Sequence, residues 1–129
     1  MITGHVFDAT ALQDLAIGKT VYVRARLRAS IAQHATIVIP AAGLARAWQL
    51  VPDHARPVLE RLPDMQVVQI DDLDDVIAQQ TGLLAAAAPD IGVDTVQAAW
   101  SARWRRWPVL TATPDAYRAL PGIRIEEIP

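Results

Sequence analysis

Residues 36–50 read TIVIPAAGLARAWQL, and this stretch decides the fold class. Its first part, Thr36–Pro40, is apolar, rich in β-branched residues and closed by a proline, which is typical of a short buried strand. The residues from Ala41 to Leu50 favour a helix, and Pro52 lies just beyond its expected end. The stretch therefore predicts a strand that passes directly into a helix, as in α/β proteins.

The same alternation of strand and helix continues in both directions. Further short apolar runs predict strands at His5–Asp8, Gln66–Ile70, Pro108–Thr111 and Ile123–Ile125. Helical patterns separate them, in segments 10–17, 20–31, 53–62, 76 to the alanine tract before Pro89, 93–106 and 114–120. We expect Thr10 and Thr20 to cap the first two helices and Gly18 to stop the first.

Short apolar strands that alternate with helices predict a parallel β-sheet covered by helices on both faces. No repeat, linker or low-complexity segment interrupts the pattern, and 129 residues is a typical length for one domain. We therefore expect a single α/β sandwich domain over residues 1–129.

The composition excludes several classes of protein. Hydrophobic residues make up 52% of the chain, and the net charge of −2 lacks the basic excess of proteins that grip nucleic acid by bulk charge. The absence of cysteine excludes thiol catalysis, iron–sulfur clusters and cysteine-ligated zinc. No apolar run approaches the ~18–20 residues of a membrane span, and residues 1–8 do not resemble a secretory signal. We expect a cytoplasmic protein with no membrane partner.

Common catalytic patterns are also missing from the sequence. The six glycines never cluster into a phosphate-binding loop or a dinucleotide fingerprint. Neither Ser30 nor Ser101 lies in a nucleophile elbow. The three histidines are scattered without metal-ligand spacing.

Carboxylates lie where an open parallel sheet binds its ligands, beyond the carboxyl ends of the strands. Asp8 closes the first predicted strand, and Asp94, with Asp90 just before it, opens the helix that leads to the fourth. If Asp8 and Asp94 meet at one rim of the sheet, they suit a hard cation such as Mg²⁺ or Mn²⁺.

A second acidic run, Asp71–Asp75, follows the predicted strand at Gln66–Ile70. Its four aspartates have two readings. In the first, the carboxylates lie at the positive end of the next helix, and each stabilises that helix by about 0.3–1 kcal/mol. In the second, they bind a metal ion. We favour the first reading.

Four segments together resemble the PIN domain family, and in particular the VapC-type toxins of bacterial toxin–antitoxin pairs. Residues 6–12 (VFDATAL) resemble the opening of a PIN domain, in which an aspartate ends the first strand. Residues 37–48 resemble its second strand, proline and following helix, and residues 94–99 (DTVQAA) resemble its third acidic motif. Residues 109–115 (VLTATPD) resemble its last strand and turn. The resemblance covers essentially the whole chain and implies a three-layer sandwich.

What the resemblance implies for function is a magnesium- or manganese-dependent endoribonuclease, in which three or four carboxylates hold one or two ions that activate water. Asp8 matches the first metal ligand and Asp94 the third, and the resemblance implies that both are catalytic. Two acidic positions of the family are substituted, by Arg46 and by Thr113. Asp90 and Asp115 lie nearby in the sequence and are further candidate ligands.

Arg46 bears directly on this site. At an effective dielectric near 20, a guanidinium ~4–6 Å from a divalent ion is repelled by about 5–8 kcal/mol. We hypothesise that Arg46 pairs with Asp8 or Asp94 and stands in for a missing cation. The alternative is a solvated arginine that contacts neither acid.

Aromatic and basic residues alternate near the end of the helix predicted at 93–106. Trp100, Trp104 and Trp107 recur at helical spacing, with Arg103, Arg105 and Arg106 between them. This pattern is typical of a subunit or packing contact, and a single-stranded RNA surface is the alternative. The contact residues expected in either case are Trp100, Arg103, Trp104 and Arg106.

Two functions follow from these observations. The first is a VapC-like ribonuclease with weakened activity that uses Mg²⁺ or Mn²⁺ and binds RNA. The second is a catalytically inactive PIN-like module, without a cofactor, that binds an antitoxin-like protein or forms a homodimer.

Overall fold

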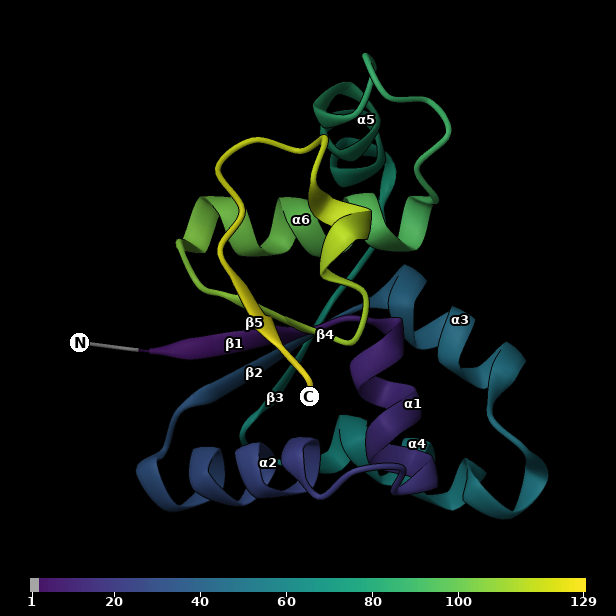
Figure 1. Cartoon of the computed structure of the whole chain (residues 1–129), viewed down its shortest axis with the longest axis vertical. Coiled ribbons are helices and arrows are strands. Elements are labelled where there is room, and N and C mark those ends of the chain that lie inside the picture. Colours follow the sequence, from purple (N-terminus) through teal and green to yellow (C-terminus); the bar gives the residue numbers. More distant parts are fainter. Residues whose placement is uncertain (1–2) are drawn as a thin grey trace.

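A computed structural model describes residues 3–129 and contains one five-stranded parallel sheet (Figure 1). Residues 1 and 2 of the predicted 1–129 domain lie outside the described residues. The strands follow the order β3-β2-β1-β4-β5 across the sheet. Their bounds are β1 (Gly4–Phe7), β2 (Thr36–Pro40), β3 (Val68–Asp71), β4 (Val109–Thr111) and β5 (Ile125–Glu127). The predicted α/β class with a parallel sheet is confirmed.

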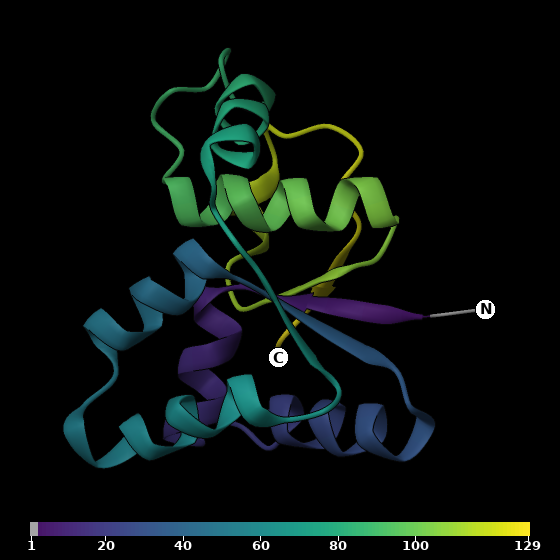
Figure 2. The same cartoon turned by 180° about the vertical axis from the view of Figure 1, so that it is seen from behind.

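Helices cover both faces of the sheet and form the outer layers of the sandwich (Figures 1 and 2). The α-helices are α1 (Ala9–Ile17), α2 (Tyr22–Gln33), α3 (Ala41–Leu50), α4 (Arg56–Arg61), α5 (Asp75–Leu84) and α6 (Val93–Arg105). Short 3-10 turns lie at Asp53–Ala55, Leu62–Asp64 and Pro114–Tyr117. Helices α1, α2 and α4 pack on one face, and α5 and α6 pack on the other (Figure 2). Helix α3 directly follows β2, so it lies at the carboxyl end of that strand, where it contacts both α1 and α6.

The alternation of strand side chains explains why two cores form. Phe7, Ile37 and Leu110 point into the core under α1, α2 and α4. Val6, Val38 and Val109, their neighbours along the chain, point into the core under α6. Because strand side chains alternate between faces, short fully apolar strands bury both sides of the sheet.

Trp107 follows α6 and packs against β1. A Cβ at Gly4 would lie 2.5 Å from both the Trp107 ring and the carbonyl oxygen of Thr36, so only glycine fits there. Trp107 is therefore part of the core, in contrast to Trp104, which is 59% exposed.

Glu126 fastens the edge strand β5 to helix α2 and strand β1. Glu126 accepts hydrogen bonds from the Tyr22 hydroxyl (2.9 Å) and from Nη2 of Arg26 (2.8 Å), and Nε2 of His5 lies 3.1 Å from its other oxygen. This strand covers residues 125–127, two residues later than the predicted Ile123–Ile125. The strand starts later because Ile125 pairs with Val109 of β4. This register places Glu126 within the strand, where it reaches Tyr22, Arg26 and His5.

Several details of the sequence prediction are wrong. Asp8, not Thr10, caps α1, because the extended backbone at Asp8 lets its carboxylate accept from the amide of Ala11. The strand expected at Gln66–Ile70 is shifted to Val68–Asp71, and the last helix is only the 3-10 turn Pro114–Tyr117. Asp71 therefore ends a strand and does not cap a helix.

Other local predictions are confirmed in part. Gly18 ends α1 in the left-handed conformation (φ 74°). The expected cap at Thr20 is wrong, because Val21 is the N-cap of α2, although the Thr20 hydroxyl still accepts from the amide of Tyr22. Asp74 caps α5 by accepting from the amide of Ile77 at 2.8 Å. Among residues 3–129, every helix is too short or too polar to cross a membrane.

Candidate functional site

The rim where β1, β2 and β4 end collects the predicted acidic positions. Asp8 follows β1, Thr111 ends β4, and the first turn of α6 carries Asp94. The side chain of Asp8 is buried, at 5% exposure, and Asp94 is half-buried. The crossover helices of the parallel sheet thus bring together residues far apart in the sequence.

Both carboxylate oxygens of Asp8 already accept hydrogen bonds. Oδ1 accepts from the Thr10 hydroxyl at 2.6 Å and from the amide of Ala11 at 3.0 Å. Oδ2 accepts from the hydroxyl of Tyr117 at 2.8 Å. Three donors therefore satisfy a buried charge that would otherwise be costly.

Tyr117 closes this rim from the 3-10 turn after β4, and it is only 3% exposed. Burial raises the pKa of Tyr117 above its ordinary value of 10, and the charges of Asp8 and Asp94 raise it further. The phenol therefore stays protonated and acts as a donor. The charges of Asp8 and Asp94 thus both act on this phenol.

Sequence reasoning missed Tyr117. The available signal was a polar aromatic residue in the segment that follows β4 at the functional rim, two residues after Asp115. A tyrosine in a short apolar segment reads as core, and only the fold brings its hydroxyl onto Asp8.

A chain of threonines continues the network away from Asp8. The Thr10 hydroxyl lies 3.2 Å from that of Thr111, which lies 3.3 Å from that of Thr113. The amide of Thr113 donates to the Thr111 hydroxyl at 3.0 Å. Thr113 thus stabilises the turn after β4 at one of the substituted acidic positions.

Arg46 lies near this rim but does not enter it. Its Nη1 donates to Oε1 of Gln49 at 2.7 Å, one turn along the exposed side of α3, and it forms no ion pair with an acid within residues 3–129. Arg46, Gln49 and Asp94 line one shallow hollow of about 350 Å³. The hypothesis that Arg46 pairs with Asp8 or Asp94 is therefore wrong, because its neighbour Gln49 holds the guanidinium in solvent.

Asp90 and Asp115 meet in a different hollow, of about 490 Å³, between the loop before α6 and the turn after β4. There Oδ1 of Asp115 accepts from Nη2 of Arg118 at 2.7 Å, and both side chains are exposed. Among residues 3–129, no three carboxylate or histidine side chains are grouped so that they could hold a metal ion. The residues at the rim therefore do not fit the magnesium site that the resemblance implies.

A buried amide holds the elements around the rim in place. Oε1 of Gln97 on α6 accepts from the amide of Ala42 in the first turn of α3 at 2.8 Å. Its Nε2 donates to the carbonyl oxygen of Asp71 at 3.0 Å. Gln97 thus ties α3 and α6 to the end of β3.

A buried ion pair lies behind this amide. Arg105 donates to both oxygens of Asp71 at 2.7 Å, and the Ser101 hydroxyl donates to Oδ2 at 2.6 Å. The side chains of Asp71 and Arg105 are 8% and 6% exposed. The planar, two-point geometry is the one in which an arginine–carboxylate pair is strongest.

The structure gathers all four predicted contact residues of α6 into one hollow of about 560 Å³ against α5. Gln80, Leu83 and Leu84 of α5 line one side. The other side is lined by Trp100, Arg103, Trp104 and Arg106. The rings of Trp100 and Trp104 are 6.1 Å apart and tilted by 50°.

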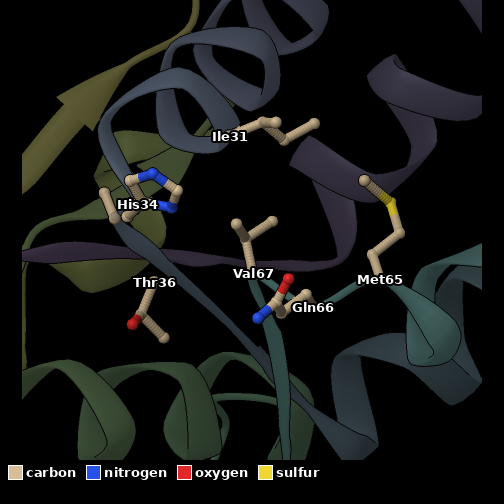
Figure 3. A pocket seen from close by; sticks show the side chains of 7 residues that line it. Ile31, His34, Thr36, Met65, Gln66 and Val67 are labelled. Carbon is tan, nitrogen blue, oxygen red and sulfur yellow. The ribbon is translucent and has the colours of Figure 1, made fainter.

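Another hollow lies away from every predicted site residue (Figure 3). It has a volume of about 410 Å³ and is formed between the end of α2 and the segment that leads into β3. Its lining, which includes His34, Met65 and Gln66, carries no carboxylate, lysine or arginine. Of the side chains that line this hollow, His34 alone could take part in acid–base or metal chemistry.

Comparison with known proteins gives a match in structure only. No protein-family model and no curated protein matches the chain. A chain of the VapBC2 complex of Rickettsia felis, bound to a DNA fragment from its promoter, has a TM-score of 0.74 at 14% identity and covers 98% of this chain and 100% of its own. DNA-bound VapBC from Salmonella typhimurium gives 0.73 at 21% identity, covering 98% of both chains.

A third similar structure is VapC20 of Mycobacterium tuberculosis, a toxin that cleaves the sarcin–ricin loop. Its TM-score is 0.69 at 13% identity, over 93% of this chain and 98% of its own. At such identities the likeness establishes the fold. The chain has the PIN fold of the VapC toxins over nearly its whole length, as the sequence predicted.

Proposed function

We propose that this protein is a VapC-like module that binds an antitoxin-like protein and does not cleave RNA. The observation that carries this proposal is the hydrogen-bonded carboxylate of Asp8, both of whose oxygens already accept, from Thr10, Ala11 and Tyr117. The substitutions at positions 46 and 113, and the separation of Asp90 and Asp115 from Asp8, support the same conclusion.

The energetics favour the hydrogen-bonded rim over a metal site. Binding a divalent ion at a millimolar dissociation constant is worth about 4 kcal/mol. An ion on Oδ2 of Asp8 has to displace the Tyr117 hydroxyl, and hydrogen bonds to charged groups contribute about 1.5–3 kcal/mol. Only Asp94 remains nearby as a second carboxylate, so little affinity is left for the metal.

The partner class follows from the proteins that share the fold. Two of them, from Rickettsia felis and Salmonella typhimurium, are VapBC complexes bound to DNA. We infer that this chain likewise associates with a small antitoxin-like protein and reaches DNA only through it, since its own net charge is −2.

Calorimetric titration with Mg²⁺ and Mn²⁺, together with an RNA cleavage assay with and without EDTA, tests the loss of catalysis. We expect no metal binding below about 1 mM and no EDTA-sensitive cleavage. The matched gain-of-site variant is Arg46→Glu/Thr113→Asp/Tyr117→Phe, which should bind Mn²⁺, and adding Asp8→Asn to it should abolish that binding. Metal-dependent cleavage by the wild-type protein that Asp8→Asn removes would show that the protein is a nuclease.

Co-expression with a small protein encoded by a neighbouring reading frame, where the genome has one, tests the partner. We expect a complex that survives size-exclusion chromatography and forms equally well with Asp8→Asn. If the two proteins elute separately, the proposed binding function is wrong, whatever the metal titration gives.

A further inference from the structure

Helix α5, the start of α6 and the segment between them line an open hollow of about 380 Å³. Figure 1 shows that this segment leaves the outer end of α5 and returns beside it to the start of α6. Successive turns hold the segment: the amide of Ala88 donates to the carbonyl oxygen of Ala85 at 2.9 Å, and the amide of Ile91 donates to that of Ala88 at 3.2 Å. The hollow therefore has hydrogen-bonded backbone walls, and its volume is within the range of about 300–1,000 Å³ that is typical of small-molecule sites.

Apolar side chains make up nearly all of the lining. Ala85 and Val96 form its buried part, at 7% and 4% exposure. Leu73 and Val93 form its exposed part, at 37% and 60% exposure, although both are aliphatic. Among the lining residues that the structure describes there is no aspartate, glutamate, lysine, arginine or histidine. The hollow therefore suits a neutral apolar molecule, which would also cover Leu73 and Val93.

Thr81 of α5 is the polar side chain of this lining. The residue is 4% exposed, and its hydroxyl has no hydrogen-bond partner within residues 3–129. A threonine inside a helix commonly bonds the carbonyl oxygen one turn before it, and Thr81 does not. A buried hydroxyl without a partner is unfavourable, and a hydroxyl can either donate or accept. Thr81 therefore supplies one hydrogen-bonding group that a bound molecule would satisfy.

Gly82, the neighbour of Thr81, also lines the hollow. Apart from its chain neighbours and the backbone of its own helix, no atom lies within 4 Å of the place that a Cβ at Gly82 would take. Packing therefore does not require glycine here, and glycine within a helix is less favourable than alanine. Glycine does allow a bound molecule to approach the helix backbone closely. Gly82 thus keeps the space beside Thr81 open, although this weakens the helix.

We propose that this hollow binds a compact neutral molecule of the phenol type, with an apolar ring and one hydroxyl group. The apolar lining contacts the ring, and the hydroxyl of the ligand forms a hydrogen bond with that of Thr81. A charged molecule is disfavoured, because no lining residue offers it an opposite charge. A rigid ring loses little conformational freedom when it binds, so it is favoured over a flexible chain.

This hollow adjoins the Asp8 rim but is distinct from it. Val93 lines both this hollow and the shallow one that contains Arg46 and Asp94, whereas Asp8 lines neither. Binding of a phenol between α5 and α6 requires neither a metal ion nor an antitoxin-like partner. The inference therefore goes beyond the proposed function and is tested independently of it.

NMR titration of the full chain with phenol, and with toluene, which lacks the hydroxyl, tests the proposal. Phenol should shift the amide signals around Thr81 and Gly82 in a saturable way, with a dissociation constant of about 0.1–1 mM. Thr81→Val keeps the shape of the side chain and removes its hydroxyl, so it should weaken phenol binding at least about fivefold and leave toluene binding no weaker. Gly82→Leu fills the hollow and should abolish the binding of both molecules.

Gln79→Leu is the control, because Gln79 is an exposed residue of α5 that does not line the hollow. It should leave both titrations unchanged, and circular dichroism should show all variants folded. Phenol titrations that do not saturate, or a Thr81→Val variant that binds phenol as well as the wild-type protein does, overturn the proposal. So does a wild-type protein that binds neither molecule and whose Gly82→Leu variant loses its complex with a co-expressed small protein, since a side chain of that partner would then fill the hollow.

Discussion

The phenol oxygen of Tyr117 lies 2.8 Å from Oδ2 of Asp8, across 109 positions of sequence. This hydrogen bond ties the turn after β4 to the end of β1 and places an O–H donor on Oδ2 of Asp8. The side chain that the PIN resemblance marks as a metal ligand is therefore an internal anchor of the fold.

Replacement of Tyr117 by phenylalanine should destabilise the protein by about 1.5–3 kcal/mol, because a buried carboxylate oxygen loses its donor. Urea unfolding measures this change. Tyr22→Phe is the matched control, since Tyr22 also donates to a carboxylate, that of Glu126, which has further donors and is less buried. Equal losses for the two variants would contradict the special role of Tyr117.

The Asp71–Arg105 pair predicts strong coupling in a double-mutant cycle. Asp71→Asn or Arg105→Met alone should cost about 3–5 kcal/mol, since each leaves a buried charge without its partner. The double variant Asp71→Asn/Arg105→Met should cost less than the sum of the two, because both charges leave together. Additive losses in urea unfolding would show that the two side chains act independently.

The His5–Glu126 contact predicts a pH dependence of stability. Burial lowers the pKa of His5 below 6.5, and it outweighs the opposite effect of Glu126. The unfolded chain then binds a proton at a higher pH than the folded protein does. His5 should therefore not reduce the free energy of unfolding above pH 6.5. Below pH 6.5 the free energy of unfolding should fall, by at most about 1.4 kcal/mol per pH unit for one proton.

His5→Gln should flatten this dependence between pH 7.5 and the onset of carboxylate protonation, as measured by urea unfolding at several pH values. His54→Gln, at an exposed histidine, is the control and should leave the slope unchanged. Identical curves for His5→Gln and the wild-type protein would exclude His5 as the source.

The left-handed residues at two helix ends predict the same gain in stability when each is replaced by glycine. Arg106→Gly and His34→Gly should each stabilise the protein by about 1 kcal/mol, because φ 60° and 54° suit glycine better. Thermal unfolding measures both changes.

Much of the fold was predictable because it depends on local patterns. Apolar β-branched runs such as Thr36–Pro40 form strands wherever helices cover both faces, and Gly18 and Asp74 mark helix ends through backbone chemistry alone. The place of Asp8 at the carboxyl end of β1 was also predictable, since it directly follows the apolar run.

The errors arise where side chains meet across the fold. Asp71 reads as a helix cap because it precedes a helix, yet Arg105, more than thirty residues later, draws it into a buried pair. Arg46 was expected to seek an acid, and its local neighbour Gln49 binds it instead. No local pattern indicates that Tyr117 donates to Asp8.

The anchoring of Asp8 affects how activity should be inferred for chains of this shape. An aspartate in this place begins α1 and fastens the turn after β4, and both tasks remain when chemistry is lost. The presence of this aspartate alone is therefore poor evidence that such a protein is catalytically active. The more informative question for a genome survey is which atom occupies the space opposite its outer oxygen, an ion or a hydroxyl group.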